Sequence, residues 1–104
     1  MVALGGNDIV KGRGGNDLIC GGDGDDDLRG GPSNDTISGG DGHDLIAGKQ
    51  DNDLLMGDQG DDTLLGNHGD DILEGNEGSD YCHGGPHDFG DVADISCEGI
   101  RATP

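Results

Sequence analysis

Aspartate recurs at every ninth position through most of this 104-residue chain. The residues that share this register are Asp8, Asp17, Asp26, Asp35, Asp44, Asp53, Asp62, Asp71 and Asp80. Carboxylate oxygens are hard ligands, and a hard divalent cation of the size of Ca²⁺ takes six to eight oxygens from carboxylates and backbone carbonyls. Because Mg²⁺ prefers a smaller octahedral shell with retained water, the pattern favours Ca²⁺.

Two further columns keep the register of the aspartates. A large apolar residue, and finally a cysteine, follows each aspartate by two positions: Val10, Ile19, Leu28, Ile37, Ile46, Leu55, Leu64, Leu73 and Cys82. Glycine precedes each aspartate by five positions from the second unit on: Gly12, Gly21, Gly30, Gly39, Gly48, Gly57, Gly66 and Gly75. The unit is G-G-x-G-x-D-x-U-x, where U is a large aliphatic residue. In the triplet x-U-x the side chains alternate between faces, so we expect the U column to point inward.

The composition alone would favour a disordered chain. Glycine takes 24 positions, only one tyrosine and one phenylalanine are aromatic, and the formal net charge is −18. Chains with few apolar residues and so much charge of one sign usually stay open. Three columns in register argue instead for a repeat fold that needs a cation. The acidity argues against nucleic acid and anionic membranes as partners, and no run approaches the roughly 18 apolar residues of a membrane span.

The unit resembles the calcium-binding nonapeptide of the repeats-in-toxin (RTX) family, and the resemblance covers residues 3–83. It implies an all-β fold, a right-handed parallel β-roll (a β-solenoid), in which each unit forms a loop and a short strand of three residues. Two nonapeptides complete one coil, so the nine units would give about four and a half coils. We expect the roll to span residues 1–83 and residues 84–104 to cap its open end.

The resemblance also implies the ligands of each ion, which would lie between two stacked loops. The first loop would supply the carbonyls of unit positions two and four, the next loop those of positions one and three, and each loop its aspartate. Between Asp26 and Asp44 the set is Gly22, Gly24, Asp26, Gly39, Asp41 and Asp44. The other candidate ligands, besides the register aspartates, are Gly6, Gly15, Gly21, Asp23, Gly30, Pro32, Gly40, Gly42, Gly57, Asp58, Gln59, Gly60, Gly75 and Glu77.

Stacking of every second loop divides the loops between two edges. The odd edge comprises residues 3–8, 21–26, 39–44, 57–62 and 75–80, and the even edge 12–17, 30–35, 48–53 and 66–71. One ion between neighbouring loops gives up to about seven Ca²⁺. Position four is glycine throughout the odd edge, but Ser33 and Asp51 occupy it in the middle of the even edge. Because a Cβ is unfavourable in a left-handed conformation, we expect a fully occupied odd edge and weak or empty sites around Ser33 and Asp51.

The metal is expected to be needed for folding. A single row of inward side chains buries too little apolar surface to offset the entropy of ordering about 80 residues. Strand hydrogen bonds close only part of that gap, and stacked carboxylates repel one another. We therefore expect the repeat region to be largely unstructured without Ca²⁺. Asp26→Asn should lose calcium at two adjacent sites, whereas the outward Asp27 should tolerate the same change.

Three cysteines leave several pairings open. Cys82 lies at an inward position and Cys97 in the expected cap, where a disulfide would fit a secreted, oxidising setting; two buried thiols are the alternative. Cys20 lies at an outward strand position and could pair upstream, pair between molecules or stay free. The ending D-x-A-x-x-x-C-E resembles the C-terminal caps of secreted actinobacterial RTX-like proteins. Met1 opens almost directly onto the repeat, which favours a chain that begins at a domain boundary.

Other motifs carry less weight. Asp23, Asp25 and Asp27 begin like an EF-hand loop, but Leu28 takes the place of the required glycine. Asp25 is instead expected at a tolerant loop position.

The histidines and cysteines also suggest no chemistry of their own. Cys82, His83 and His87 could be drawn as a transition-metal site, but their spacing through Gly-Gly-Pro gives it no geometric support. His43 and His68 lie at variable loop positions and are expected to be solvated. No set of serine, histidine and carboxylate suggests hydrolysis, so we do not expect an enzyme.

Apolar residues at outward strand positions leave two interpretations. Leu45, Leu54, Met56, Leu65 and Ile72 fit either ordinary β-propensity on a half-wet sheet or a patch for a partner protein or a second copy. Ice binding, a property of some RTX-like rolls, is disfavoured because position three lacks a regular rank of threonine. The leading hypothesis is a secreted calcium-binding module that folds on binding several ions, and the alternative is an extracellular interaction or adhesion module.

Overall fold

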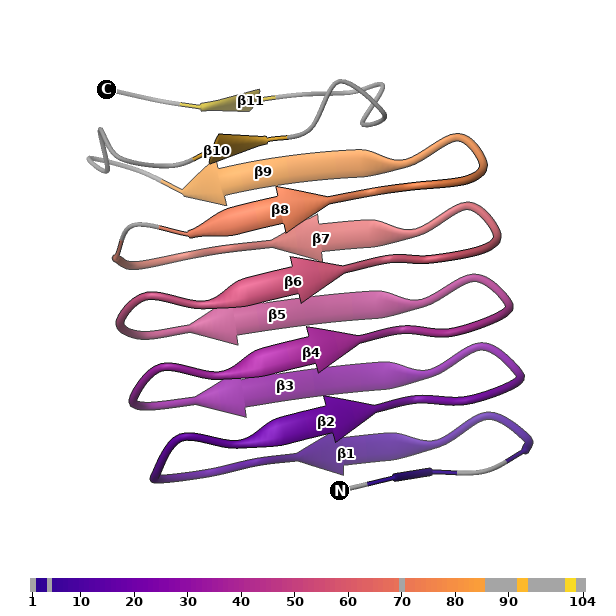
Figure 1. Ribbon diagram of the computed structural model, residues 1–104, viewed down its shortest axis with the longest axis horizontal. Coiled ribbons are helices and arrows are strands. Elements are labelled where there is room, and N and C mark those ends of the chain that lie inside the picture. The colour runs from indigo at the N-terminus through magenta and orange to yellow at the C-terminus, as the bar shows by residue number, and fades with distance from the viewer. Residues whose placement is uncertain (1, 4, 70, 86–91, 94–100, 103–104) are drawn as a thin grey trace.

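The computed structural model describes residues 2–3, 5–69, 71–85, 92–93 and 101–102. This part of the chain contains strands and loops only, wound into the stacked coils of a parallel β-solenoid of about four turns (Figure 1). The predicted β-roll is therefore confirmed. The described residues contain no helix with the length and apolar character needed to cross a bilayer.

The strands form two sheets on opposite sides of the coil. The six-stranded sheet contains β1 (Ile9–Lys11), β3 (Asp27–Gly31), β5 (Leu45–Lys49), β7 (Thr63–Leu65), β9 (Tyr81–Gly85) and β11 (Arg101–Ala102), in that order. The five-stranded sheet contains β2 (Leu18–Cys20), β4 (Thr36–Ser38), β6 (Leu54–Met56), β8 (Ile72–Glu74) and β10 (Val92–Ala93). All pairings are parallel. Within the repeat each residue pairs with the one 18 positions on, as Leu28 does with Ile46.

Three strands of the six-stranded sheet are longer than the triplet expected from the repeat. β3, β5 and β9 each span five residues, because they continue into positions one and two of the next unit. The pairing of Gly31 with Lys49 carries the β3–β5 ladder into the even edge. The expectation of a three-residue strand in every unit was thus wrong for these three units.

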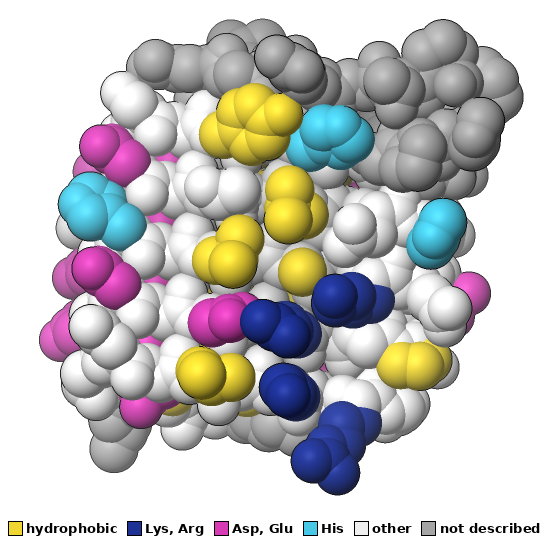
Figure 2. Space-filling view, turned by 180° about the vertical axis from the view of Figure 1, so that it is seen from behind, with side chains coloured by type: hydrophobic (Ala, Val, Ile, Leu, Met, Phe, Trp, Pro, Cys, Tyr) yellow, Lys and Arg dark blue, Asp and Glu magenta, His cyan; other side chains and the backbone are white. Residues whose placement is uncertain are grey.

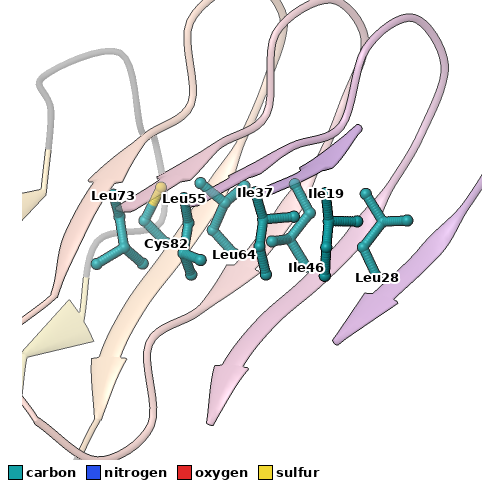
Figure 3. Packing of buried hydrophobic residues seen from close by; sticks show 8 residues of the cluster. All are labelled: Ile19, Leu28, Ile37, Ile46, Leu55, Leu64, Leu73 and Cys82. Atoms are coloured by element: carbon teal, nitrogen blue, oxygen red, sulfur yellow. The ribbon is translucent and has the colours of Figure 1, made fainter. Parts of the chain in front are cut away.

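The core is a single file of side chains between the two sheets (Figure 3). Its members are fully buried: Ile19, Leu28, Ile37, Ile46, Leu55, Leu64, Leu73 and Cys82. Val10 packs against this file at the N-terminal end. These are the residues of the U column, so the predicted inward face is confirmed. Since each coil contributes only two of them, the apolar core stays one side chain thick.

The loops join the sheets at two edges, the odd edge at the right of Figure 1 and the even edge at the left. Beyond residue 83, β10 pairs with β8 and β11 pairs with β9, so both sheets continue past the last full unit. At the other end the Ala3 N–H donates to the Cys20 carbonyl at 2.9 Å. The rest of the expected cap, residues 86–91, 94–100 and 103–104, lies outside the described residues.

Candidate metal sites

The register aspartates are buried although they carry charge. Seven of them expose at most 3% of their surface: Asp26, Asp35, Asp44, Asp53, Asp62, Asp71 and Asp80. Each lies at the end of a loop and directly precedes a strand, so that its side chain turns into the coil. Buried carboxylates need hydrogen bonds or a cation to offset the loss of solvation. The two oxygens of each carboxylate meet this need differently.

One carboxylate oxygen joins successive coils. The Oδ1 atom accepts the backbone N–H of the register aspartate 18 residues earlier, at 2.7–2.8 Å, through all seven pairs from Asp8–Asp26 to Asp62–Asp80. In the pair Asp26–Asp44, for example, the Asp26 N–H donates to Asp44 Oδ1 at 2.8 Å. The aspartate column is therefore a continuous ladder along each edge. Its spacing holds the loops in the register that any bridging ion would need.

The other oxygen is buried without a hydrogen-bond partner. This holds for the Oδ2 atoms of six described aspartates: Asp17, Asp26, Asp35, Asp44, Asp53 and Asp62. A buried, unsatisfied carboxylate oxygen costs several kcal/mol, of the order of that of an unpaired charge. A regular series of such atoms indicates that something else neutralises them, and the candidates are a cation or a proton.

The position-one glycines leave room for these oxygens. A Cβ on Gly21 would lie 2.7 Å from Asp26 Oδ2 and 2.5 Å from the carbonyl oxygen of Gly39 in the next loop. The corresponding distances at Gly39 are 2.5 Å to Asp44 Oδ2 and 2.9 Å to the Gly57 carbonyl. The carboxylate oxygen Oδ2 of one loop and the carbonyl oxygen of the next loop thus both lie close to the position-one glycine. No hydrogen-bond donor of the described residues reaches the Oδ2 atom. This arrangement suits a cation with oxygen ligands.

The carbonyls of positions two and four face the next loop. A Cβ on Gly24 would clash with the Gly6 carbonyl oxygen, and one on Gly40 would clash with the Gly22 carbonyl oxygen. The same close approach recurs at Gly42 and Gly60 along the odd edge. These carbonyls thus point from one loop toward the next, and their role as calcium ligands stays a prediction. At position three Asp23, Pro32, Asp41, Gln59 and Glu77 have exposed side chains, and a ligand role for their carbonyls stays a prediction.

The backbone at position four is left-handed on both edges. Glycine adopts φ of 92° to 109° at Gly6, Gly24, Gly42, Gly60 and Gly78, whereas Ser33 and Asp51 adopt 80° and 70°. The latter two are left-handed residues with a Cβ, which is a strained conformation. The backbone is left-handed at position two as well, which the sequence pattern did not predict. The residues with a side chain there, Arg13, Lys49, Asp58, Asn67 and Asn76, have φ of 66° to 79°.

Burial raises the pKa of the central aspartates. It raises the pKa of Asp44 to about 6 and those of Asp53 and Asp62 to about 7. Burial also raises the pKa of Asp35. Repulsion from neighbouring carboxylates adds to the shift, and the hydrogen bond from the backbone of the preceding register aspartate opposes it. Aspartates with a raised pKa lie on both edges, Asp44 and Asp62 on the odd edge and Asp35 and Asp53 on the even edge. The raised pKa values therefore do not distinguish one edge from the other.

A second ladder, at position five, was not foreseen. On the odd edge Asn7 accepts the Asp25 N–H, Asp25 accepts the His43 N–H, and His43 Nδ1 accepts the Asp61 N–H, at 2.8–2.9 Å. On the even edge Asn16 and Asn34 accept in the same way. The prediction that His43 is solvated is confirmed, since His43 is exposed, as is Asp25, and each side chain also accepts a backbone N–H from the next loop. The signal was present in the sequence, since position five holds only residues with a polar acceptor.

Clusters of metal-binding side chains are a poor guide to this fold. Among the described residues no group of three or more His, Cys, Asp or Glu side chains is placed to hold a metal ion. Each expected calcium site contains only two carboxylates, and its other ligands are backbone carbonyls. Such a site therefore needs no group of three metal-binding side chains. Cys82 is buried in the core file and His83 is half-buried on the outer side of β9, which gives no support to a Cys82–His83 metal site; His87 lies outside the described residues.

Comparison with known families decides the assignment. A family model that describes four copies of the RTX calcium-binding nonapeptide repeat matches residues 1–28, 21–55 and 56–86. The chain belongs to this RTX family. No curated protein and no solved structure matches it. The RTX repeats together with the β-roll make the chain a calcium-binding module, and proteins of this repeat family are typically structural and not catalytic.

Proposed function

We propose that this RTX chain is a calcium-dependent folding module, whose coils form when Ca²⁺ enters between stacked loops. The observation that carries the proposal is the series of buried Oδ2 atoms without hydrogen-bond partners, repeated along both edges. Charge supports it as well, because about seven Ca²⁺ would bring the formal net charge from −18 to about −4. Binding energy that is available only in the folded coils appears as folding free energy.

The proposed ligands of each ion are those that the RTX resemblance implies, and the direction of the carbonyls at positions two and four supports them. For the ion between the third and fifth units we assign the carbonyls of Gly22, Gly24, Gly39 and Asp41 and the carboxylates of Asp26 and Asp44. Each inner register aspartate then serves two ions, one toward each neighbouring loop. The same pattern predicts sites along the odd edge, and weaker ones on the even edge near Ser33 and Asp51.

The experiment is a far-UV circular dichroism titration combined with a metal count. We expect little β structure in excess EDTA, a cooperative gain of β signal with added Ca²⁺, and several ions bound per chain by calorimetry. A β spectrum that is unchanged by EDTA would overturn calcium-dependent folding. A stoichiometry of zero or one ion would overturn the stacked-site assignment even if the fold depended on calcium.

We further propose that the module belongs to a secreted protein and acts without catalysis of its own. A Cys82–Cys97 disulfide, which suits an oxidising compartment, would tie the end of the chain to the core file. Cys82 is fully buried at the end of that file, whereas Cys97 lies outside the described residues. Mass spectrometry of the non-reduced chain tests the pairing. Alkylation of both residues without prior reduction would rule it out. Cys20 is a half-buried free thiol in the structure.

The second candidate function is an extracellular interaction or adhesion module. The favouring observation is that four apolar side chains at position seven are exposed: Ile9, Leu18, Leu45 and Ile72, of which Ile9 exposes 71%. Leu54, Met56 and Leu65 are only half-buried, which leaves further apolar area on the outer faces. Sedimentation in the presence of Ca²⁺ separates the two functions, since a self-associating surface would give a concentration-dependent mass.

A further inference from the structure

Basic residues gather on one face of this acidic molecule. Four of its five lysines and arginines, Lys11, Arg13, Arg29 and Lys49, line one open groove of about 570 Å³. Figure 2 shows them as a dark blue group on the outer face of the six-stranded sheet, with the acidic loops of the odd edge along the left side. None of the described residues that line the groove carries a carboxylate. A chain with a net charge of −18 thus concentrates its positive charge in one place.

Gly31 forms the floor between these side chains. It pairs with Lys49 in the next coil, and a Cβ on it would lie 2.8 Å from the Arg13 carbonyl oxygen in the preceding coil. Arg29 lies two residues before Gly31 on β3, and its register partner on β1 is Lys11. The four cationic residues therefore surround a position without a side chain. This leaves space for a ligand between them.

Two of these cations occupy strained backbone positions. Arg13 and Lys49 adopt φ of 69° and 79° at position two, where Gly22, Gly31 and Gly40 stand in other units. A side chain in the left-handed conformation is unfavourable, and glycine avoids this cost. The repeat itself does not call for a long basic residue there. Asp58, Asn67 and Asn76 share this conformation at position two, so what distinguishes Arg13 and Lys49 is their long basic side chains.

Most of the positive charge in the groove is not compensated by an ion pair in the described part of the chain. Arg29 donates to both carboxylate oxygens of Asp27, at 3.0 and 2.9 Å, which compensates one of the four cations. No ion pair within the described part of the chain reaches Lys11, Arg13 or Lys49. Three neighbouring cations of this kind repel one another, and an anion between them would relieve that repulsion. A ligand with about three negative charges would match them.

We propose that this groove binds a small, densely charged oxyanion that carries two or more sulfate or phosphate groups. The planar fork of Arg13 suits such groups, and Lys11 and Lys49 supply further positive charge. The carboxylates of an acidic peptide carry one charge each and lie farther apart. A long polyanion such as DNA would extend from the groove over the aspartates of the odd edge, which would repel it. The site does not depend on which ligands hold calcium, but it needs the coils to be stacked.

Calorimetry on the calcium-loaded chain tests this proposal. The probes are a trisulfated disaccharide, its desulfated form, glucose 1,6-bisphosphate, a tetra-aspartate peptide and a short DNA oligonucleotide. We expect binding of the sulfated or the phosphorylated sugar that weakens with added NaCl, and no binding of the desulfated one. The two charged sugars show whether sulfate or phosphate is preferred. Tighter binding of the peptide or of the DNA would overturn the assigned ligand class.

The test variants introduce residues that other units of the repeat carry at the same position. Arg13→Gly/Lys49→Gly removes two cations and installs the glycine that other units carry at position two, so the coils should be retained. Asn76→Gly makes the same backbone change on the odd edge, away from the groove. We expect the dissociation constant to rise at least tenfold in the double variant and to stay unchanged in Asn76→Gly.

Two results would contradict the proposal. Equal affinity of the double variant and the wild type would show that the groove is not the site. Binding that persists after EDTA has removed the β-sheet signal would show that the assembled groove is not required. Circular dichroism of each sample separates a loss of the coils, which concerns the calcium proposal, from a loss of the ligand.

Discussion

The odd and even edges are built from the same repeat but differ in their backbone and their charge. At the odd edge every position four is glycine, and an open groove of about 470 Å³ is lined by Asp8, Asp25, Asp26, Asp27, Asp44 and Asp61 among others. At the even edge Ser33 and Asp51 replace glycine, and the position-two residues Arg13 and Lys49 are basic. One edge is thus regular and strongly anionic, and the other is irregular and partly cationic.

This difference shows what the repeat fixes and what it leaves free. The register aspartates are equally buried at both edges, with Asp26 at 3% and Asp35 at 2% exposure, because the coil interior is the same on both sides. The side chains that surround them are not held by the core. An edge can therefore keep its ligand column and still differ in cation affinity. We expect the odd edge to bind calcium more tightly than the even edge.

The largest effect should come from removing one bridging carboxylate on each edge. Asp26→Asn should lose about two bound ions and, with calcium a hundredfold above the dissociation constant, about 5 kcal/mol of stability. Asp35→Asn, its counterpart on the even edge, should lose fewer ions and less stability, since its sites adjoin Ser33 and Asp51. Calorimetric stoichiometry and thermal unfolding in Ca²⁺ measure both. Equal losses would refute the difference between the edges.

Acidity should substitute for calcium at both edges alike. The folded-state pKa values of Asp44, Asp53 and Asp62, about 6 to 7, lie above the ordinary value of 3.8, so the folded chain binds protons that the unfolded chain releases. Their contribution to stability is therefore present below about pH 4 and is lost as the pH rises through 6 to 7. Circular dichroism in EDTA should show more β structure at pH 4.5 than at pH 8.

With calcium present the dependence should reverse, because cations and protons compete for the same carboxylates. The apparent calcium affinity should rise between pH 5 and pH 7.5. An EDTA-treated chain whose β signal increased with pH would contradict the burial of these groups. Comparison of Asp26→Asn with Asp35→Asn under the same conditions should reveal little difference between the edges, in contrast to their calcium binding.

Exchange of position four should give an intermediate effect. Gly42→Ser forces a Cβ against the Gly24 carbonyl oxygen and should cost about 1–3 kcal/mol. Ser33→Gly removes the strain on the even edge and should lower the calcium concentration needed for half-maximal folding. Calcium titrations of the two variants against the wild type measure these shifts. Shifts in the same direction would show that position four does not set the affinity.

The smallest effect should follow from Asp27→Asn. Asp27 is paired with Arg29 on the outer face, where solvent screens the ion pair and leaves it a small contribution to stability. Thermal unfolding should therefore change little, in agreement with the tolerance expected from the sequence. A loss of calcium binding in this variant would show that the outer face of the strand contributes to the odd edge.

Much of this architecture could be predicted from the spacing of residues along the chain. The aliphatic column forms the core file from Ile19 to Cys82, and the aspartate column forms the buried ladder at both edges. The inward position of the aliphatic column is confirmed, because a strict nine-residue period leaves each inward position the same neighbours in every coil, whereas calcium ligation by the aspartates stays a prediction. The strand lengths were less predictable. β3, β5 and β9 continue past their triplets as far as position two of the next unit.

The sequence by itself determined the coil, its core and its column of aspartates, since these depend on a local period that one unit repeats. Only the tertiary structure showed that His43 accepts the Asp61 N–H, and that Arg13, Arg29 and Lys49 surround Gly31. These contacts join residues in successive coils, and their side chains are directed by a left-handed backbone at position two and by loop hydrogen bonds. No period in the sequence encodes such lateral contacts, because they arise only when the coils are stacked.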